Sequence, residues 1–98
     1  MKYNYDEDNI LKQITDYVNS TYNQHYVAES KGSQVIDTWE ACGSLETTAR
    51  DTALKYLMRY GKKEGKNKKD LLKAIHYIIL MIYINEKEQN ETYTGAQL

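Results

Sequence analysis

A lysine-rich connection between two stretches of helical periodicity is the feature that most constrains the fold of this chain. Residues 45–60 carry apolar side chains three and four positions apart, which predicts a helix that stops at Gly61. Residues 67–84 repeat this spacing, with Asn67 as the expected cap and Asp70 reaching back to it. Residues 61–67 hold three lysines and two glycines. A connection this short predicts an antiparallel helical hairpin.

The apolar side of each predicted helix is expected to be buried. For the helix of residues 45–60 these side chains are Leu45, Ala49, Ala53, Tyr56, Leu57 and Tyr60. For the next helix they are Leu71, Leu72, Ile75, Ile78, Ile79 and Ile82. Residues 77–84 are apolar on all sides, so a buried strand is the alternative there, but no helix breaker precedes them. A helix that is apolar all round must be covered all round, which predicts a homo-oligomer through the helix of residues 68–84.

The remaining segments also indicate helices. An acidic start at residues 6–8 precedes a helix whose apolar side holds Ile10, Leu11, Ile14 and Val18. Residues 19–34 are expected to be a loop. A short helix capped by Ser33 is then expected to bury Val35, Ile36, Trp39 and Cys42 and to end at Gly43, after which Ser44 caps the hairpin. We therefore predict an all-α protein with an N-terminal helix and loop (1–24), a helical domain (25–84) and a polar, fraying tail (85–98).

Charge is unevenly distributed along the chain. The net charge is -1, but residues 55–73 hold 8 basic and 2 acidic residues, a balance of +6. Residues 1–54 carry -5 and residues 74–98 carry -2. A basic patch within an otherwise acidic protein favours a compact anion over a long nucleic acid, which the acidic remainder repels, and no feature favours a membrane.

The cysteine content and the termini indicate the compartment. Cys42 is the single cysteine, so no internal disulfide can form and a reducing interior is favoured. No signal peptide is recognisable, because the amino terminus is acidic and has no apolar segment. We therefore expect a soluble cytoplasmic protein.

Charged residues of the hairpin are the candidate ligand contacts. Lys55 and Arg59 are four residues apart and share one helix face, where they can seat a phosphate and the guanidinium supplies a fork. On the second helix, Asp70, Lys73 and Tyr77 follow one another at three- and four-residue intervals. An antiparallel hairpin would bring both sets to one opening. The alternative is a solvated lysine-rich surface.

Other motifs are weaker. Residues 61–67 resemble a phosphate-binding P-loop but lack its glycine spacing, its Ser or Thr and the preceding strand. His25 and Tyr26 form a loop pair that can face a ligand or lie in solvent. His76 and Trp39 are expected to be packing residues. The histidines and Cys42 have no metal-ligand spacing, so no metal site is predicted, and no nucleophile–base pair can be named for catalysis.

The order of these residues resembles a small bacteriophage family called SaV-like, whose members are often named nucleotide kinases. The matching blocks are His25-Tyr26, Val35-Ile36-Asp37, Lys55-Tyr56-Leu57-x-Arg59-x-Gly61-x-Lys63 and Asp70-Leu71-x-Lys73-Ala74-x-x-Tyr77. The chain departs from the pattern in residues 27–33, where a glycine-rich patch is expected, and at Asp51-Thr52, where Gly-Asn is usual. Loss of that asparagine would affect catalysis more than binding.

The resemblance implies a helical domain that handles nucleotides. Lys55, Arg59 and Lys73 would contact phosphates, Lys63 would be a further ligand-binding residue, and His25 and Tyr26 would form a second wall. Tyr77 would support this site and Asp70 would lie within it.

Three functions remain open from the sequence. The first is a phage protein in the infected host's cytoplasm that binds a nucleotide or cyclic nucleotide and sequesters a host defence signal. The second is a kinase that transfers phosphate from ATP to a deoxynucleoside monophosphate, with magnesium and a carboxylate such as Asp70 or Asp51 nearby. The third is an interaction protein whose lysines serve solubility. A chain of 98 residues leaves little room for two substrates, which favours binding.

Overall fold

The computed structural model describes residues 3–22, 31–62 and 65–97, which form four α-helices. Within those residues there is no β-strand, so the predicted all-α class is confirmed, and residues 77–84 are helical. The chain divides into two compact units, Met1–Asp37 and Thr38–Leu98, each of which is described by itself. Over the same residues, no helix is both long and apolar enough to cross a membrane.

Helix α1 (Glu7–Thr21) begins where the acidic residues predict. Glu7 and Asp8 lie in its first turn, where carboxylates are favourable against the helix dipole. No residue of α1 is buried. Ile10 and Leu11 are exposed and Ile14 and Val18 are half-buried, so the apolar side expected to be covered is covered only in part. The helix continues through Thr21, which shortens the expected loop of residues 19–34 at its start.

Helix α2 (Lys31–Ala41) begins two residues before Ser33, so the prediction that Ser33 caps this helix is wrong. Its expected burial is also wrong for Val35 and Cys42, which are exposed, while Ile36 and Trp39 are half-buried. The predicted end is confirmed. Gly43 has a φ of 77° and donates to the Glu40 carbonyl, and the amide of the next residue donates to the Trp39 carbonyl. This pair of bonds is a Schellman motif, which glycine favours.

Helix α3 (Leu45–Arg59) follows directly. Ser44 occupies its N-cap position, but the hydroxyl does not bond to the first turn as predicted. Instead Ser44 Oγ donates to the Trp39 carbonyl at 3.3 Å, because the chain has just left α2. Thr47 Oγ1 bonds the Ser44 carbonyl at 3.2 Å. The side chain therefore links two helices rather than capping one.

A tight turn closes the hairpin. Gly61 and Gly65 have φ angles of 84° and 72°, which favour glycine, and the Gly61 amide donates to the Gly65 carbonyl at 2.8 Å. The predicted cap Asn67 is confirmed, since its Oδ1 accepts from the Lys69 amide at 2.9 Å. The Asp70 side chain does not complete a capping box; it turns toward α3, as described below.

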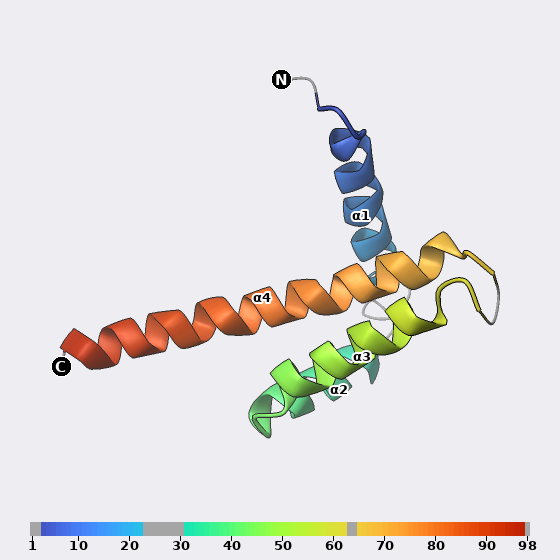
Figure 1. Cartoon of the computed structure of the whole chain (residues 1–98). Helices are drawn as coiled ribbons and strands as arrows, with labels where there is room; N and C mark the ends of the chain where they lie inside the picture. Colours follow the sequence, from blue (N-terminus) through green and yellow to red (C-terminus); the bar gives the residue numbers. More distant parts are fainter. Residues whose placement is uncertain (1–2, 23–30, 63–64, 98) are drawn as a thin grey trace. The chain divides into compact units, whose positions relative to one another are not determined.

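Helix α4 (Lys68–Gln97) is longer than predicted, because residues 85–97 continue the helix instead of fraying. The first half of α4 runs antiparallel to α3, which confirms the predicted hairpin, and the remainder extends past the start of α3 (Figure 1). Thirty residues correspond to a helix of about 45 Å.

The core between α3 and α4 is narrow. Its buried apolar side chains are Leu45, Ala49, Ala53, Ala74 and Ile84. The prediction holds for the first three, whereas Leu57 is exposed. On α4 the predicted burial is wrong for Ile78, Ile79 and Ile82, which are exposed, and incomplete for Leu71, Leu72 and Ile75, which are half-buried. The helix turns Ala74 and Ile84 toward α3, and this places the isoleucine-rich side away from it.

Candidate functional site

The ring of Tyr56 lies at the centre of three cationic side chains. Lys55 Nζ is 4.7 Å from the ring centroid and Lys73 Nζ is 5.1 Å from it. The guanidinium carbon of Arg59 is 6.0 Å away. Each distance is within the range of a cation–π contact, so the negative face of one aromatic ring offsets part of the repulsion among the three charges. We call Tyr56 and these three cations the Tyr56 cluster.

Tyr77 supports this cluster from α4. The rings of Tyr56 and Tyr77 are stacked, with centroids 6.3 Å apart and planes at 18°. Such an offset pair stabilises the contact between two helices beyond the area it buries. Burial raises the pKa of Tyr77, and its nearness to Tyr56 adds to this shift. The Tyr77 ring therefore remains neutral in ordinary conditions, and it packs against the ring that the three cations surround.

Asp70 supplies the opposing charge. Its carboxylate Oδ1 is 3.6 Å from Arg59 Nε, and the Asp70 side chain is only 4% exposed, against 32% for Arg59. The other oxygen, Oδ2, has no hydrogen-bond partner among the described residues. A buried carboxylate is tolerated when a cation lies beside it. The pair therefore fixes the direction of Arg59 while the Tyr56 cluster keeps a net positive charge.

The spacing of the sequence explains this assembly. Lys55 and Arg59 are one turn apart on α3, and Asp70, Lys73 and Tyr77 are one turn apart on α4. The antiparallel packing of the two helices brings all five together, as the hairpin predicts. His25, Tyr26 and Lys63 lie outside the described residues.

Sequence reasoning missed the central place of Tyr56, which had been assigned to the apolar stripe of α3. Its neighbour in sequence, Lys55, and Arg59 one turn on already marked it as an aromatic residue among cations. The hairpin also predicts that Lys73 lies at the same opening, but only the packing of α4 shows that its ammonium group reaches the Tyr56 ring.

His76 lies next to this site. Its ring centroid is 6.5 Å from that of Tyr77, and burial lowers the pKa of His76 below 6.5. The imidazole is therefore mostly neutral at pH 7, and it adds little positive charge to the Tyr56 cluster. This agrees with the packing role expected for it.

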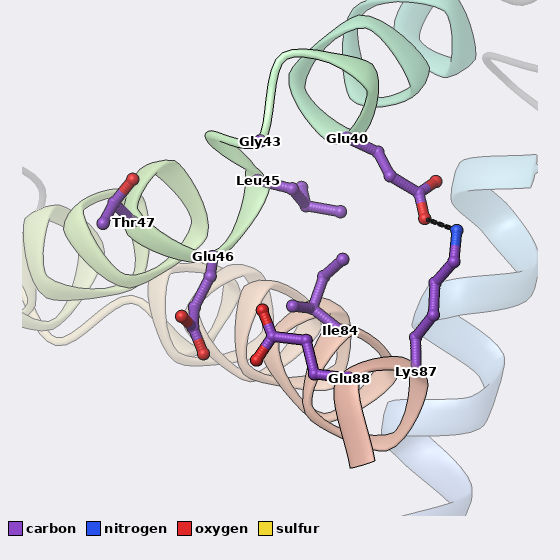
Figure 2. Close-up of a pocket in the computed structure, with 8 residues that line it drawn as sticks. All are labelled: Glu40, Gly43, Leu45, Glu46, Thr47, Ile84, Lys87 and Glu88. Carbon is purple, nitrogen blue, oxygen red and sulfur yellow. Dashed lines mark hydrogen bonds and ion pairs between the residues drawn. The ribbon is translucent and has the colours of Figure 1, made fainter. Parts of the chain in front are cut away.

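A second group of polar residues lies at the other end of the hairpin (Figure 2). The Glu40 carboxylate accepts hydrogen bonds from Tyr83 Oη and Lys87 Nζ, both at 2.7 Å. The bonds from Lys87 and then Tyr83 hold the pKa of Glu40 below its usual range. Glu40 is more than forty positions away from both donors in the sequence, so no local pattern predicted these contacts. The bonds tie the end of α2 to α4.

Beside this group is a pocket of about 220 Å³. Leu45 and Ile84, which line it, point toward each other in Figure 2, and the carboxylates of Glu46 and Glu88 lie near each other. Its charged lining residues are Glu40, Glu46, Glu88 and Lys87, so the pocket is acidic and differs in charge from the Tyr56 cluster.

The carboxylates near the Tyr56 cluster are few. Asp51 is exposed and lies 3.6 Å from Arg50 Nε, rather than being directed toward Lys55. In the described part of the chain, no three His, Cys, Asp or Glu side chains are grouped as a metal site. The chemistry gathered at this point is that of cations and aromatic rings, which suits the recognition of an anion.

Comparison with known proteins identifies the family. The chain matches DUF3310, a family described as a protein of unknown function, over residues 18–79. This match spans more than half of the chain and includes the whole Tyr56 cluster. The chain therefore belongs to the DUF3310 family. Searches of curated proteins and of solved structures gave no match.

Proposed function

We propose that this protein binds the phosphate of a nucleotide at the Tyr56 cluster. The observation that carries the proposal is the gathering of Lys55, Arg59 and Lys73 around one ring, with Asp70 as the nearby opposing charge. Three cations against one carboxylate leave a local excess of positive charge, which favours an incoming anion. A guanidinium fork and two ammonium groups are the donors that proteins commonly use for phosphate.

The arrangement suits a small ligand. The three cations surround a ring that is itself only half-buried, so an anion can reach them from solvent. The rest of the chain is acidic, with -5 over residues 1–54 and -2 over residues 74–98, which disfavours a long polyanion. A mononucleotide, dinucleotide or cyclic nucleotide meets both conditions.

Binding without catalysis is the version we favour. The Asp70 carboxylate is buried and already lies beside Arg59, so it is poorly placed to hold magnesium in solvent. By the resemblance described above, the protein would act in the cytoplasm of a phage-infected bacterium. There it would sequester a host signalling nucleotide and so weaken a defence response.

The test is a thermal-shift and calorimetric screen against mono-, di-, tri- and cyclic nucleotides, with and without magnesium, in which the bound ligand is recovered for mass analysis. We expect binding without magnesium and recovery of the intact ligand. A phosphorylated product that appears only with ATP and magnesium would instead establish the kinase. If no nucleotide binds, the binding protein and the kinase are both excluded, and the interaction protein is the function that remains.

Variants locate the site. Lys55→Ala and Lys73→Ala should each weaken binding about tenfold to a hundredfold, since a charge-assisted hydrogen bond contributes about 1.5–3 kcal/mol. The matched control is Lys66→Ala, which removes the same charge from the exposed turn. Arg59→Ala is less informative because it leaves the buried Asp70 carboxylate without its cation. Equal weakening by Lys66→Ala would mean that the basic segment attracts anions without a defined site.

A further inference from the structure

Helix α4 carries an apolar side that faces away from α3. Asp70, Ala74 and Ile84 are buried toward α3. The opposite side carries Leu71, Leu72, Ile75, Ile78, Ile79 and Ile82, which we call the outer face. Ile78, Ile79 and Ile82 are 40%, 38% and 54% exposed. Monomeric proteins rarely leave such a continuous row of isoleucines in water.

The small core indicates that this surface contributes to stability when covered. Three of the five buried apolar residues in the described part of the chain are alanines, which bury little area. Burial contributes about 25 cal/mol per Å² of apolar surface, so a core of this kind stabilises a chain of 98 residues only weakly. Small domains of this type commonly gain the missing burial by association.

The charges at the two ends of the outer face select a partner and an orientation. Lys68 precedes the face and Glu86 follows it. They are 18 residues apart, which is five full helical turns, so both lie on the same side of α4, about 27 Å from each other. If two α4 helices pack antiparallel about a point near residue 77, Lys68 of each copy meets Glu86 of the other. In a parallel pair, lysine would meet lysine and glutamate would meet glutamate.

We infer that a second copy of this chain covers the outer face, with the two α4 helices antiparallel and two Lys68–Glu86 ion pairs between the copies. The contact is isologous, which is the commonest symmetry of protein dimers, and it closes without leaving a free face that would build filaments. The same register sets Leu72 opposite Ile82 and Ile75 opposite Ile79. This inference does not depend on nucleotide binding, because the Tyr56 cluster lies on the other side of α4.

The experiment is a charge-reversal cycle on the full chain, read as the dimer dissociation constant by sedimentation velocity. Lys68→Glu or Glu86→Lys alone converts both ion pairs into like-charge contacts, and each should raise the dissociation constant at least about tenfold. The double variant should return it close to the wild-type value. A larger assembly that follows the same pattern would equally support the antiparallel contact.

Two apolar variants complete the test. Ile79→Asp should abolish association, whereas Leu54→Asp, at a similarly exposed position on α3, should leave it unchanged. Circular dichroism checks that both remain helical. A monomeric wild-type protein, a double charge variant no better than the single ones, or a dimer that survives Ile79→Asp would overturn the inference. Nucleotide binding measured on the same samples tests the Tyr56 cluster separately.

Discussion

Arg59 Nε lies 3.6 Å from Asp70 Oδ1, and this pair joins the last turn of α3 to the first turn of α4. It lies beside the tight turn at Gly61 and Gly65, so it fixes both the closure of the hairpin and the direction of one cation of the Tyr56 cluster. If the Tyr56 cluster binds an anion as proposed, stability and binding are coupled through the buried Asp70 carboxylate. This coupling and the packing around it lead to four predictions.

Replacing Asp70 by alanine should lower the free energy of unfolding by about 1–3 kcal/mol, because Arg59 loses its buried counterion. The value is kept below that of a fully buried pair because Arg59 is about one-third exposed. Urea denaturation measures the change. Asp51→Ala, which removes an exposed carboxylate from α3, is the control and should shift stability by no more than about 0.5 kcal/mol. Equal losses of stability in the two variants would show that the Arg59–Asp70 pair contributes no more than an exposed carboxylate does.

Replacing Tyr56 by leucine should weaken nucleotide binding about threefold to tenfold, because the three cations lose the ring that holds them together. Tyr56→Phe keeps the aromatic face and should bind like the wild type. Calorimetric titration of both variants, with Tyr60→Leu as a control at the C-cap of α3, makes the comparison. Similar affinities for the leucine and phenylalanine variants would show that the aromatic ring of Tyr56 does not contribute to nucleotide binding.

Truncating Leu45 to alanine should destabilise the protein by about 2–3 kcal/mol, since Leu45 is 1% exposed and fills the space next to Ile84. Leu57→Ala makes the same chemical change at an exposed position of α3, where little burial is lost. The test compares the denaturant midpoints of the two variants, provided that the dependence of the unfolding free energy on denaturant concentration (the m-value) is the same for both. If Leu57→Ala costs as much, Leu57 is covered in solution by another chain.

Stability should fall as the pH is lowered through about 6.5, because burial lowers the pKa of His76 in the folded state. The unfolded chain then binds the proton more readily than the folded one. The free energy of unfolding therefore increases with pH as His76 loses its proton, and the stability gained in this way is lost as the pH falls below about 6.5. His76→Gln should flatten this dependence between about pH 5.5 and 7. Unfolding curves of both proteins across that range, in one buffer series, give the comparison. An unchanged slope would assign the dependence to other groups.

Much of the hairpin was predictable from local pattern. The period of residues 45–60 and 67–84, the stops at Gly43 and Gly61 and the cap at Asn67 all follow from preferences that act within a few residues. The same holds for the pairing of Lys55 with Arg59 and of Lys73 with Tyr77, which requires only the pitch of a helix. The DUF3310 match over residues 18–79 covers these four residues.

Burial was where sequence reasoning went wrong. Periodicity shows that Ile78, Ile79 and Ile82 share a side of α4, but it does not show which side faces α3. The structure places Ala74 and Asp70 there instead, because small side chains and an ion pair let the helices approach closely. Similarly, the serine expected to cap α3 bonds backward to Trp39, since the end of α2 is within its reach.

The sequence by itself determined the helices, their stops and the basic segment, because each depends on neighbours within one or two turns. Only the tertiary structure decided that Lys73 joins Lys55 and Arg59 at Tyr56, that Asp70 is buried against Arg59, and that Glu40 bonds to Tyr83 and Lys87. These contacts join residues from different helices. Their geometry depends on how α4 is rotated against its neighbours, and the rotation is set by packing over the whole interface rather than by any local preference.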